Sequence, residues 1–420
     1  MHQTQRWLVI AIAAAFSVPF SASAQSEPSS SPNVLGGDLT LNARLRYESV
    51  TDDAASDADA LTLRSALAWR SRALFGSRSL SAIMEVENTV ALDGTDYSDG
   101  ETNRATALIA DPPGTELNQL FIGFQSARGW RARIGRQPIS FGDERFVGTV
   151  AFRQNHQSFD ALSLTHDSSD DWALNYAYVA NVNRIFGDAA DGPVAGLLGD
   201  HKQDTHLLNA VFKGWSFGEL ESYAYLIGNE DFQRASMDTF GARFSGSVRP
   251  KRLTYLYTLE AASQSSRSDN PRDYSAVFTR VSGGISYKRF SVQLTQERLG
   301  SDNGSGFITP FATLHRFQGW ADKFAAQTPD QGLVAQFVTI AGRWPGFRYR
   351  LQYHDFDTDV GSQNIGRELG LHVQHRVRQN LFIGIKFADY RASRSAPTLG
   401  GFDADTRRLF LSISGSVGGR

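Results

Sequence analysis

The sequence predicts an all-β protein: a transmembrane antiparallel β-barrel of about eighteen strands. Three observations support this fold class. Apolar and polar residues alternate along many segments, as in 39–48 and 347–354, and a period of two gives a strand one apolar and one polar face. The segments run for about 10 to 13 residues, longer than soluble strands and sufficient to cross a bilayer at a tilt. The connections between them alternate between long and short, as in bacterial transmembrane barrels.

The first 24 residues are expected to be a signal peptide and no part of the fold. Arg6 precedes the apolar stretch 7–20, and residues 22–24 (Ala-Ser-Ala) form a small-x-small cleavage pattern. An N-terminal anchor helix is the alternative, but this stretch is shorter than the roughly 20 residues of a spanning helix. We therefore expect an exported chain with a periplasmic leader at 25–37 and a barrel at 38–417.

The alternating segments define the strands of this barrel. In chain order they are expected at 38–49, 60–71, 78–90, 116–126, 130–138, 157–166, 171–181, 205–215, 217–228, 238–248, 251–263, 275–288, 289–300, 332–343, 346–357, 365–377, 380–391 and 405–417. Eighteen is an even number, as single-chain bacterial barrels require. A plugged transporter of about 22 strands would need a longer chain.

Connection lengths and tryptophans give the barrel two distinct ends. Most connections after odd-numbered strands are long, whereas those after even-numbered strands are short, such as 127–129 and 249–250. The tryptophans beside short turns are Trp69, Trp130, Trp172, Trp215 and Trp344, while Trp320 lies in a long loop. Tryptophans at one depth are typical of the aromatic girdle of a membrane interface. The alternative is the core of a soluble β-sandwich, where tryptophans would not gather at one end of the strands.

Composition excludes several other classes of protein. The chain has no Cys and a formal net charge of −2, so it offers no disulfide scaffold and no overall attraction to nucleic acid. Beyond the N-terminal stretch, no run of 18 apolar residues suggests a membrane-spanning helix. The histidines are scattered, and His372 and His375 point to opposite faces of one strand. We expect no enzyme, no cofactor and no metal site.

Counted by parity, the polar face of the strands has more basic than acidic residues. The basic residues are Arg44, Arg46, Arg64, Arg70, Arg131, Arg133, Arg243, Arg280, Arg348, Arg350, Arg376, Arg378, Lys386 and Arg408; the acidic ones are Glu48, Glu85, Glu87, Glu219, Glu221, Glu260, Glu297 and Glu368. The long loops are instead rich in aspartate. A basic lumen is therefore expected under acidic loops, and its arginines suit carboxylate ligands. Many of these residues are alternatively expected to pair across the lumen and stiffen the wall.

Two stretches resemble the alginate export family of outer-membrane porins. The first comprises residues 133–137 (RIGRQ), 141–148 (FGDERFVG), 152–155 (FRQN) and 158–161 (SFDA); the second is 314–324 (LHRFQGWADKF). The resemblance implies an eighteen-stranded barrel with inturned loops at 139–156 and 301–331. It also implies an electropositive constriction for a polyuronate, with Arg136, Asp143, Glu144, Arg145 and Arg153 lining it. The alternative for Asp143, Glu144 and Arg145 is that they pin the loop to the wall.

Two features depart from the family pattern. The last strand ends in Ser416-Val417-Gly418 without the usual C-terminal aromatic residue. Strict alternation from Ile134 also turns Arg136 toward lipid, unless a bulge at Gly135 or a strand end above the bilayer changes its direction.

Together these observations predict a passive channel in the outer membrane for an anionic oligosaccharide or polyuronate such as alginate. Its pathway is expected to include Arg131, Arg133, Arg348, Arg350, Arg376 and Arg378 besides the residues implied by the resemblance. The alternatives are a general anion-preferring diffusion porin and a structural or adhesive barrel plugged by its loops. Expected partners are outer-membrane lipid, lipopolysaccharide, the anionic saccharide and the barrel assembly machinery, without nucleic acid.

Overall fold

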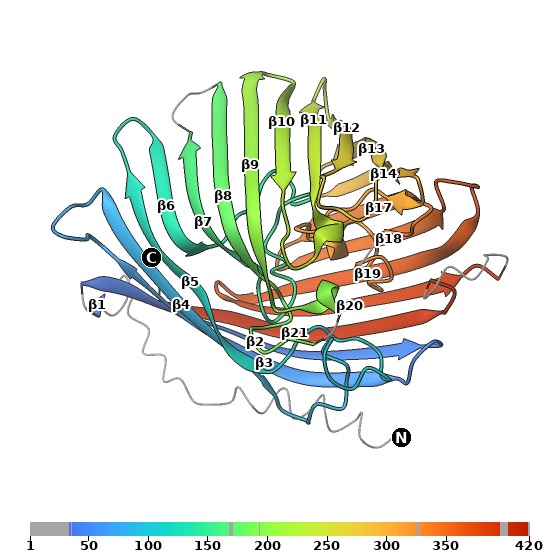
Figure 1. Ribbon diagram of the computed structural model, residues 1–420, viewed down its shortest axis with the longest axis horizontal. Coiled ribbons are helices and arrows are strands. Elements are labelled where there is room, and N and C mark those ends of the chain that lie inside the picture. The colour runs from blue at the N-terminus through green and yellow to red at the C-terminus, as the bar shows by residue number, and fades with distance from the viewer. Residues whose placement is uncertain are drawn as a thin grey trace.

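The computed structural model is a ring of long antiparallel strands (Figure 1). It describes residues 33–34, 36–167, 171–192, 194–325, 328–394 and 402–418. The expected signal peptide and most of the expected leader lie outside these ranges. The described part of the leader includes the short strand β1 (Asn33–Val34), which pairs with Gly37 and Asp38. Within the described ranges, no helix has both the length and the apolar character that crossing a membrane requires.

Eighteen strands form the barrel, and each expected strand is confirmed. They are β2 (Gly37–Asp52), β3 (Ala58–Ser71), β4 (Leu80–Ala91), β5 (Gly114–Gln125), β6 (Trp130–Gln137), β7 (Ser158–His166), β8 (Trp172–Asn183), β9 (Asp200–Trp215), β10 (Gly218–Ile227), β11 (Met237–Val248), β12 (Leu253–Ser266), β13 (Ser275–Tyr287), β14 (Phe290–Leu299), β17 (Leu333–Trp344), β18 (Phe347–Asp357), β19 (Asn364–Arg378), β20 (Leu381–Ala392) and β21 (Thr406–Gly418). The two-residue strands β15 (Ser301–Asp302) and β16 (Ser305–Gly306) form a separate hairpin in a loop.

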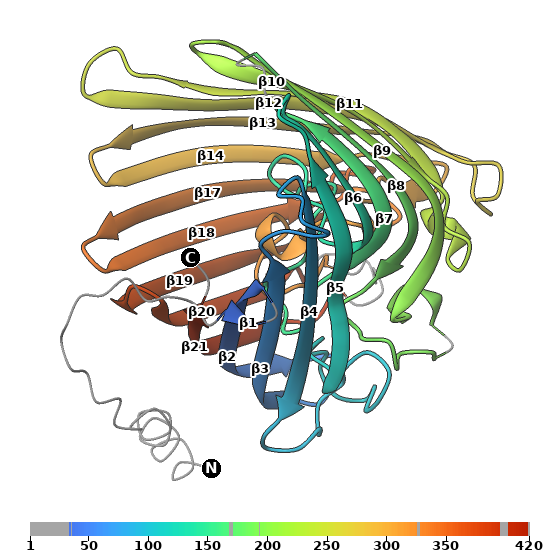
Figure 2. The ribbon, with the colours of Figure 1, turned by 90° about the vertical axis from the view of Figure 1, so that its left-hand side faces the viewer.

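The sheet closes between the first and last barrel strands. β2 pairs antiparallel with β21 from Thr40↔Gly418 to Asp52↔Thr406, and every other barrel strand pairs with its neighbours in the chain. Closure removes free strand edges, whose backbone N–H and C=O groups would have no hydrogen-bond partner in lipid. Figure 2 shows the strands curving around the interior from a second direction.

The two faces of the strands follow the alternation of the sequence. Large apolar residues such as Ile134, Leu294 and Ile385 are exposed on the outer face, where they suit a lipid environment. Trp130, Trp172, Trp215 and Trp344 are exposed at strand ends beside the short turns, whereas Trp320 is buried. The inner face carries buried charged residues such as Glu48, Arg64 and Glu297.

The long connections lie at one end of the barrel, and two of them pack against its inner wall. We call 138–157 and 300–332 the lumen loops. They join each other through the parallel bridge Val147↔Phe311 and the hydrogen bond from Gly148 N to Phe311 O, 2.8 Å long. Phe146, Phe307 and Phe311 belong to one apolar core with wall residues such as Phe278. The interior at this end is therefore a packed core.

The outer face predicts a test of orientation within one strand. Leu411 of β21 lies opposite Ile385 on the outer face, whereas Ser414 borders a cavity on the inner face. Leu411→Arg places a charge in lipid and should lower the free energy of unfolding by roughly 2–4 kcal/mol. Ser414→Arg, the matched control, should change it little. Heat-modifiable migration and denaturant unfolding in lipid measure both, and equal losses would contradict the assignment of faces.

Candidate functional site: the barrel lumen

The lumen has a paired and an unpaired charged region. Near the long loops, arginines of the wall and of the lumen loops form ion pairs with buried carboxylates. Near the short turns, the wall carries arginines without acidic neighbours. The first region fixes the lumen loops, and the second leaves positive charge available to a ligand.

Asp143 attaches the first lumen loop to one side of the wall. Its carboxylate lies 3.0 Å from Arg243 Nη1 of β11 and 2.8 Å from Arg280 Nη1 of β13. These arginines also pair with Glu221 and Glu260, each at 2.5 Å. Burial alone would raise the pKa of Asp143, but the two guanidinium groups outweigh it and hold the pKa below its usual range. Asp143 is therefore a charged anchor.

Arg145 is buried between the lumen loops and the wall. Its side chain is 1% exposed, its Nε lies 3.1 Å from the Glu297 carboxylate of β14, and its Nη1 donates to Thr309 Oγ1 at 3.1 Å. The guanidinium carbon also lies 5.0 Å from the centre of the Phe278 ring, a distance that allows a cation–π interaction. Arg145 consequently holds the two loops against β14 rather than facing open lumen.

Glu144 joins the lumen loops to each other. Its backbone is in the left-handed region, at φ 67°, and its carboxylate accepts a hydrogen bond of 2.6 Å from Thr313 Oγ1 of the second loop. Thr313 N in turn donates to Glu144 O at 3.1 Å. Thr313 is the donor in both hydrogen bonds, and together they tie the first lumen loop to the second.

Arg153 attaches the end of the first lumen loop to the opposite side of the wall. It pairs with Glu48 of β2 at 3.0 Å and with Asp322 of the second loop at 2.6 Å. Arg408 of β21 also pairs with Glu48, at 2.7 Å. Burial would lower the pKa of Arg153, but these carboxylates outweigh it and raise the pKa above its usual range. Arg153 therefore stays charged and bridges the loops to the strands that close the barrel.

A buried histidine completes this contact. His315 Nδ1 lies 2.6 Å from Asp322 Oδ1, and its Nε2 lies 2.8 Å from Lys386 Nζ of β20. Burial lowers the pKa of His315 to about 3, so its ring is neutral at neutral pH. A neutral ring has one donor and one acceptor, and the partners assign the donor to Nδ1 and the acceptor to Nε2. The His315 ring also stacks on Phe152, with centroids 3.7 Å apart.

The second lumen loop is also held by its backbone. Trp320 N and Ala321 N donate to the Glu368 carboxylate of β19, at 2.5 and 3.1 Å. Gly319 precedes them at φ 86°, and a Cβ there would overlap Glu368. Only glycine combines this backbone conformation with so close an approach.

Arg136 does not join these residues. It lies opposite Leu120 and Asp160 in the register of β6, and directly opposed residues share a face. Leu120 is exposed among the outward-facing residues of β5, so Arg136 is also on the outer face. Its Nε is 2.8 Å from Asp160 Oδ1, and its Nη1 donates to Leu117 O at 3.1 Å. The pairing of β6 continues across Gly135 without a register shift, and β6 ends one residue after Arg136.

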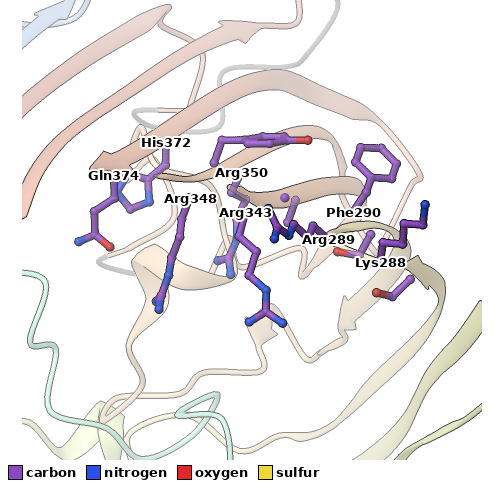
Figure 3. Close-up of a pocket in the computed structure, with 13 residues that line it drawn as sticks. Lys288, Arg289, Phe290, Arg343, Arg348, Arg350, His372 and Gln374 are labelled. Atoms are coloured by element: carbon purple, nitrogen blue, oxygen red, sulfur yellow. The ribbon is translucent and has the colours of Figure 1, made fainter. Parts of the chain in front are cut away.

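The unpaired region is clearest on β17 and β18. Arg343, Arg348 and Arg350 line one cavity with Lys288 and Arg289 from the β13–β14 turn. Figure 3 shows Arg343 and Arg348 projecting from the same side of the sheet, with His372 and Gln374 of β19 beside them. In the part of the chain that the structure describes, these five basic side chains form no ion pair. We call them the basic wall.

Other expected pathway residues lie at the same end of the barrel. Arg376 and Arg378 are exposed beside the β19–β20 turn. On β6, Arg131 is exposed, and the Arg133 guanidinium carbon lies 5.1 Å from the centre of the Phe121 ring. β6 is the fifth barrel strand and β17 the fourteenth, so half of an eighteen-stranded ring separates them. Arg131 and Arg133 therefore lie across the barrel from Arg343.

The sequence contains a signal for the basic wall that parity alone does not reveal. No Asp or Glu occurs in 239–259, 274–296, 331–354 or 369–388, the segments that span the four short turns from β11 to β20. Lys288, Arg289 and Arg343 lie in these segments and were absent from the expected pathway. An arginine without a carboxylate on the neighbouring strand has no local partner. Hairpins that contain no Asp or Glu therefore indicate unpaired positive charge more precisely than the count of basic against acidic residues over the whole lumen.

Comparison with known proteins agrees with this architecture. The family model for alginate export matches residues 37–394. The chain belongs to the alginate export family. Comparison with curated proteins gives no match.

Solved structures of outer-membrane channels share the fold. OccAB4 of Acinetobacter baumannii is 11% identical with a TM-score of 0.69, over 92% of this chain and 100% of that one. OccAB1 of the same species is 13% identical with a TM-score of 0.68, over 94% and 100%. OccD3 of Pseudomonas aeruginosa is 12% identical with a TM-score of 0.66, over 92% of both chains. The family match and the barrel fold support an outer-membrane channel, and the family favours transport over catalysis.

The buried Arg145–Glu297 pair predicts how firmly the first lumen loop is held. Arg145→Ala leaves Glu297 with Arg280, 3.7 Å away, as its one cationic neighbour among the described residues, and should lower the free energy of unfolding by about 3 kcal/mol. Loop 138–157 should then be cut faster in limited proteolysis. The double variant Arg145→Met/Glu297→Gln removes both charges and should recover much of the loss. Wild-type proteolysis rates in Arg145→Ala would contradict the anchoring role.

Proposed function

We propose that the lumen conducts anionic oligosaccharides or polyuronates, with alginate as the named candidate. The observation that carries this proposal is the basic wall, where Arg343, Arg348 and Arg350 face the lumen without carboxylate partners. Buried arginines whose donors already bond to carboxylates attract a third group weakly. The paired arginines near Asp143 and Glu48 therefore contribute little, and the basic wall supplies the attraction.

The chemistry of the basic wall suits a polymer with one carboxylate on each sugar. Such a polymer loses water on entering the pore, and fixed cations must replace that water. Guanidinium groups bind carboxylates through two parallel hydrogen bonds. Arg131 and Arg133 stand across the barrel, so the charge is spread over several sites. Several weak sites favour conduction because the ligand can leave each one.

A general diffusion porin for small anions is the second candidate. The packed lumen loops favour it, because they occupy the end of the barrel that a polymer must also pass. Small anions can pass through a narrower opening than a hydrated sugar chain can. Both candidates require anion selectivity, and only the first requires that oligouronates enter the pore and block the current.

The basic wall predicts which arginines set selectivity. Replacing Arg343, Arg348 and Arg350 with Ala should reduce the preference for chloride over potassium several-fold in planar bilayers at 0.1 M salt. It should also abolish current block by oligouronates. At 1 M salt the screening length falls to about 3 Å, and wild type and variant should converge. Arg136→Ala is the matched control because Arg136 is paired on the outer face, so its selectivity should equal that of wild type. A wild-type channel that prefers potassium at low salt would contradict the proposal.

The position of the basic wall also predicts a difference between the two sides of the channel. The unpaired arginines lie beside the short turns, while the opposite loops are rich in aspartate. Oligouronate added on the short-turn side should therefore block at a concentration at least threefold lower than on the other side. Oriented single channels measure this ratio. Equal block from both sides would place the controlling charge elsewhere in the lumen.

A further inference from the structure

A row of arginines lies on the outer surface of the barrel, away from the lumen. Arg298 of β14, Arg367 of β19, Arg391 of β20 and Arg407 of β21 have side chains that are 52%, 60%, 50% and 54% exposed. Arg367 lies opposite Arg391, and Arg407 lies opposite Asp389 on β20. We call these four residues the outer arginine row.

The outer arginine row lies where the apolar outer surface of the barrel ends, on the side of the long loops. On β19, Arg367 is followed on the same face by Leu369 and Leu371, both exposed. On β21, Arg407 is followed by Leu409 on the outward-facing side, opposite Phe387. The arginines lie toward the long loops, at the end away from the exposed tryptophans. They therefore occupy the headgroup level of the outer leaflet when the apolar surface occupies the hydrocarbon.

Aspartates orient all four arginines of the row. Arg298 and Arg391 bond to them through both Nε and Nη groups, whereas Arg367 and Arg407 keep donors for a ligand. Arg367 Nε lies 3.2 Å from Asp355 Oδ2, and Arg407 Nε lies 3.3 Å from Asp389 Oδ1. Both Nη groups of Arg367 and of Arg407 remain without a partner among the described residues. Arg367 and Arg407 are two strands apart, or roughly 10 Å at the usual strand spacing. A guanidinium held in place loses less side-chain entropy when it binds a ligand.

The row is confined to one sector of the barrel. Strands β7 to β13 contain only two arginines, Arg243 and Arg280, and both pair with Asp143 inside the lumen. Arg136 of β6 is on the outer face, but Asp160 and the Leu117 carbonyl occupy its Nε, Nη1 and Nη2 groups. Arg136 therefore offers a matched control: an outward arginine with few free donors, outside the row.

We propose that the outer arginine row binds the phosphate groups of lipopolysaccharide in the outer leaflet. The exposed Nη groups of Arg367 and Arg407 match phosphate oxygens, which guanidinium groups bind through paired, charge-assisted hydrogen bonds. The level of the row places it against lipid headgroups on the long-loop side. The site serves to hold a lipid beside β19–β21, and it is independent of what passes through the lumen.

Native mass spectrometry of the purified full-length barrel with bis-phosphorylated lipid A tests the proposal. Wild type should retain lipid A, and Arg367→Gln/Arg407→Gln should bind it at least tenfold more weakly. Arg367→Lys/Arg407→Lys keeps the charge without the planar fork and should fall between them. Arg136→Gln should bind like wild type. Lipid A without phosphates should bind wild type no better than it binds the Gln double variant.

Three results would overturn the proposal. These are wild-type affinity in the Gln double variant, an equal loss in Arg136→Gln, and binding that does not change when the phosphates are removed. Heat-modifiable migration confirms that each variant is folded. If the double variant does not fold, the single variants Arg367→Gln and Arg407→Gln replace it. Each is expected to bind lipid A at least threefold more weakly than wild type.

Discussion

Every other feature of this protein depends on the pairing of β2 with β21. Lipid offers no hydrogen-bond partners, so a sheet in the membrane must satisfy all of its backbone groups internally. Thirteen residue pairs, from Thr40↔Gly418 to Asp52↔Thr406, join the two ends of the chain. Closure creates the lumen and assigns an outside and an inside to each strand. The charged face can then lie away from lipid, and the lumen loops acquire a wall on every side.

Inside this wall, charged side chains have two different roles. Glu48 and Glu297 are buried with arginines, Asp143 is partly buried with two of them, and all three fix the lumen loops, because an unpaired buried charge costs far more than a pair. The basic wall is the opposite case: its arginines remain near water and keep their charge for a ligand. The two regions differ in the presence of carboxylates rather than in the number of arginines. The function of the lumen therefore depends on where acidic residues are missing.

Local pattern predicted the fold well but predicted the site only in part. Alternation identified all eighteen strands because period two acts along each strand and needs no distant partner. It also placed Arg348 and Arg350 on the inner face. It could not show that Arg145 meets Glu297, since 152 positions separate them in the chain. For Arg136 the two lines of reasoning disagreed: alternation placed it on the outer face, whereas the family resemblance placed it in the pore. The strand register places it on the outer face, as alternation predicted.

The anchoring of the lumen loops has a consequence for the order of assembly. Arg153 bonds to Asp322 over 169 positions, and Lys323 bonds to Asp52 over 271. Contacts between such distant parts of a chain form slowly, because long segments must first be brought together. The loops also lie within a wall that has no gap once β2 meets β21. The second lumen loop also contacts both strands of that seam, because Lys323 pairs with Asp52 of β2 and Arg408 Nε of β21 donates to Ala321 O. The packed interior can therefore be completed only once the two ends of the barrel have come together.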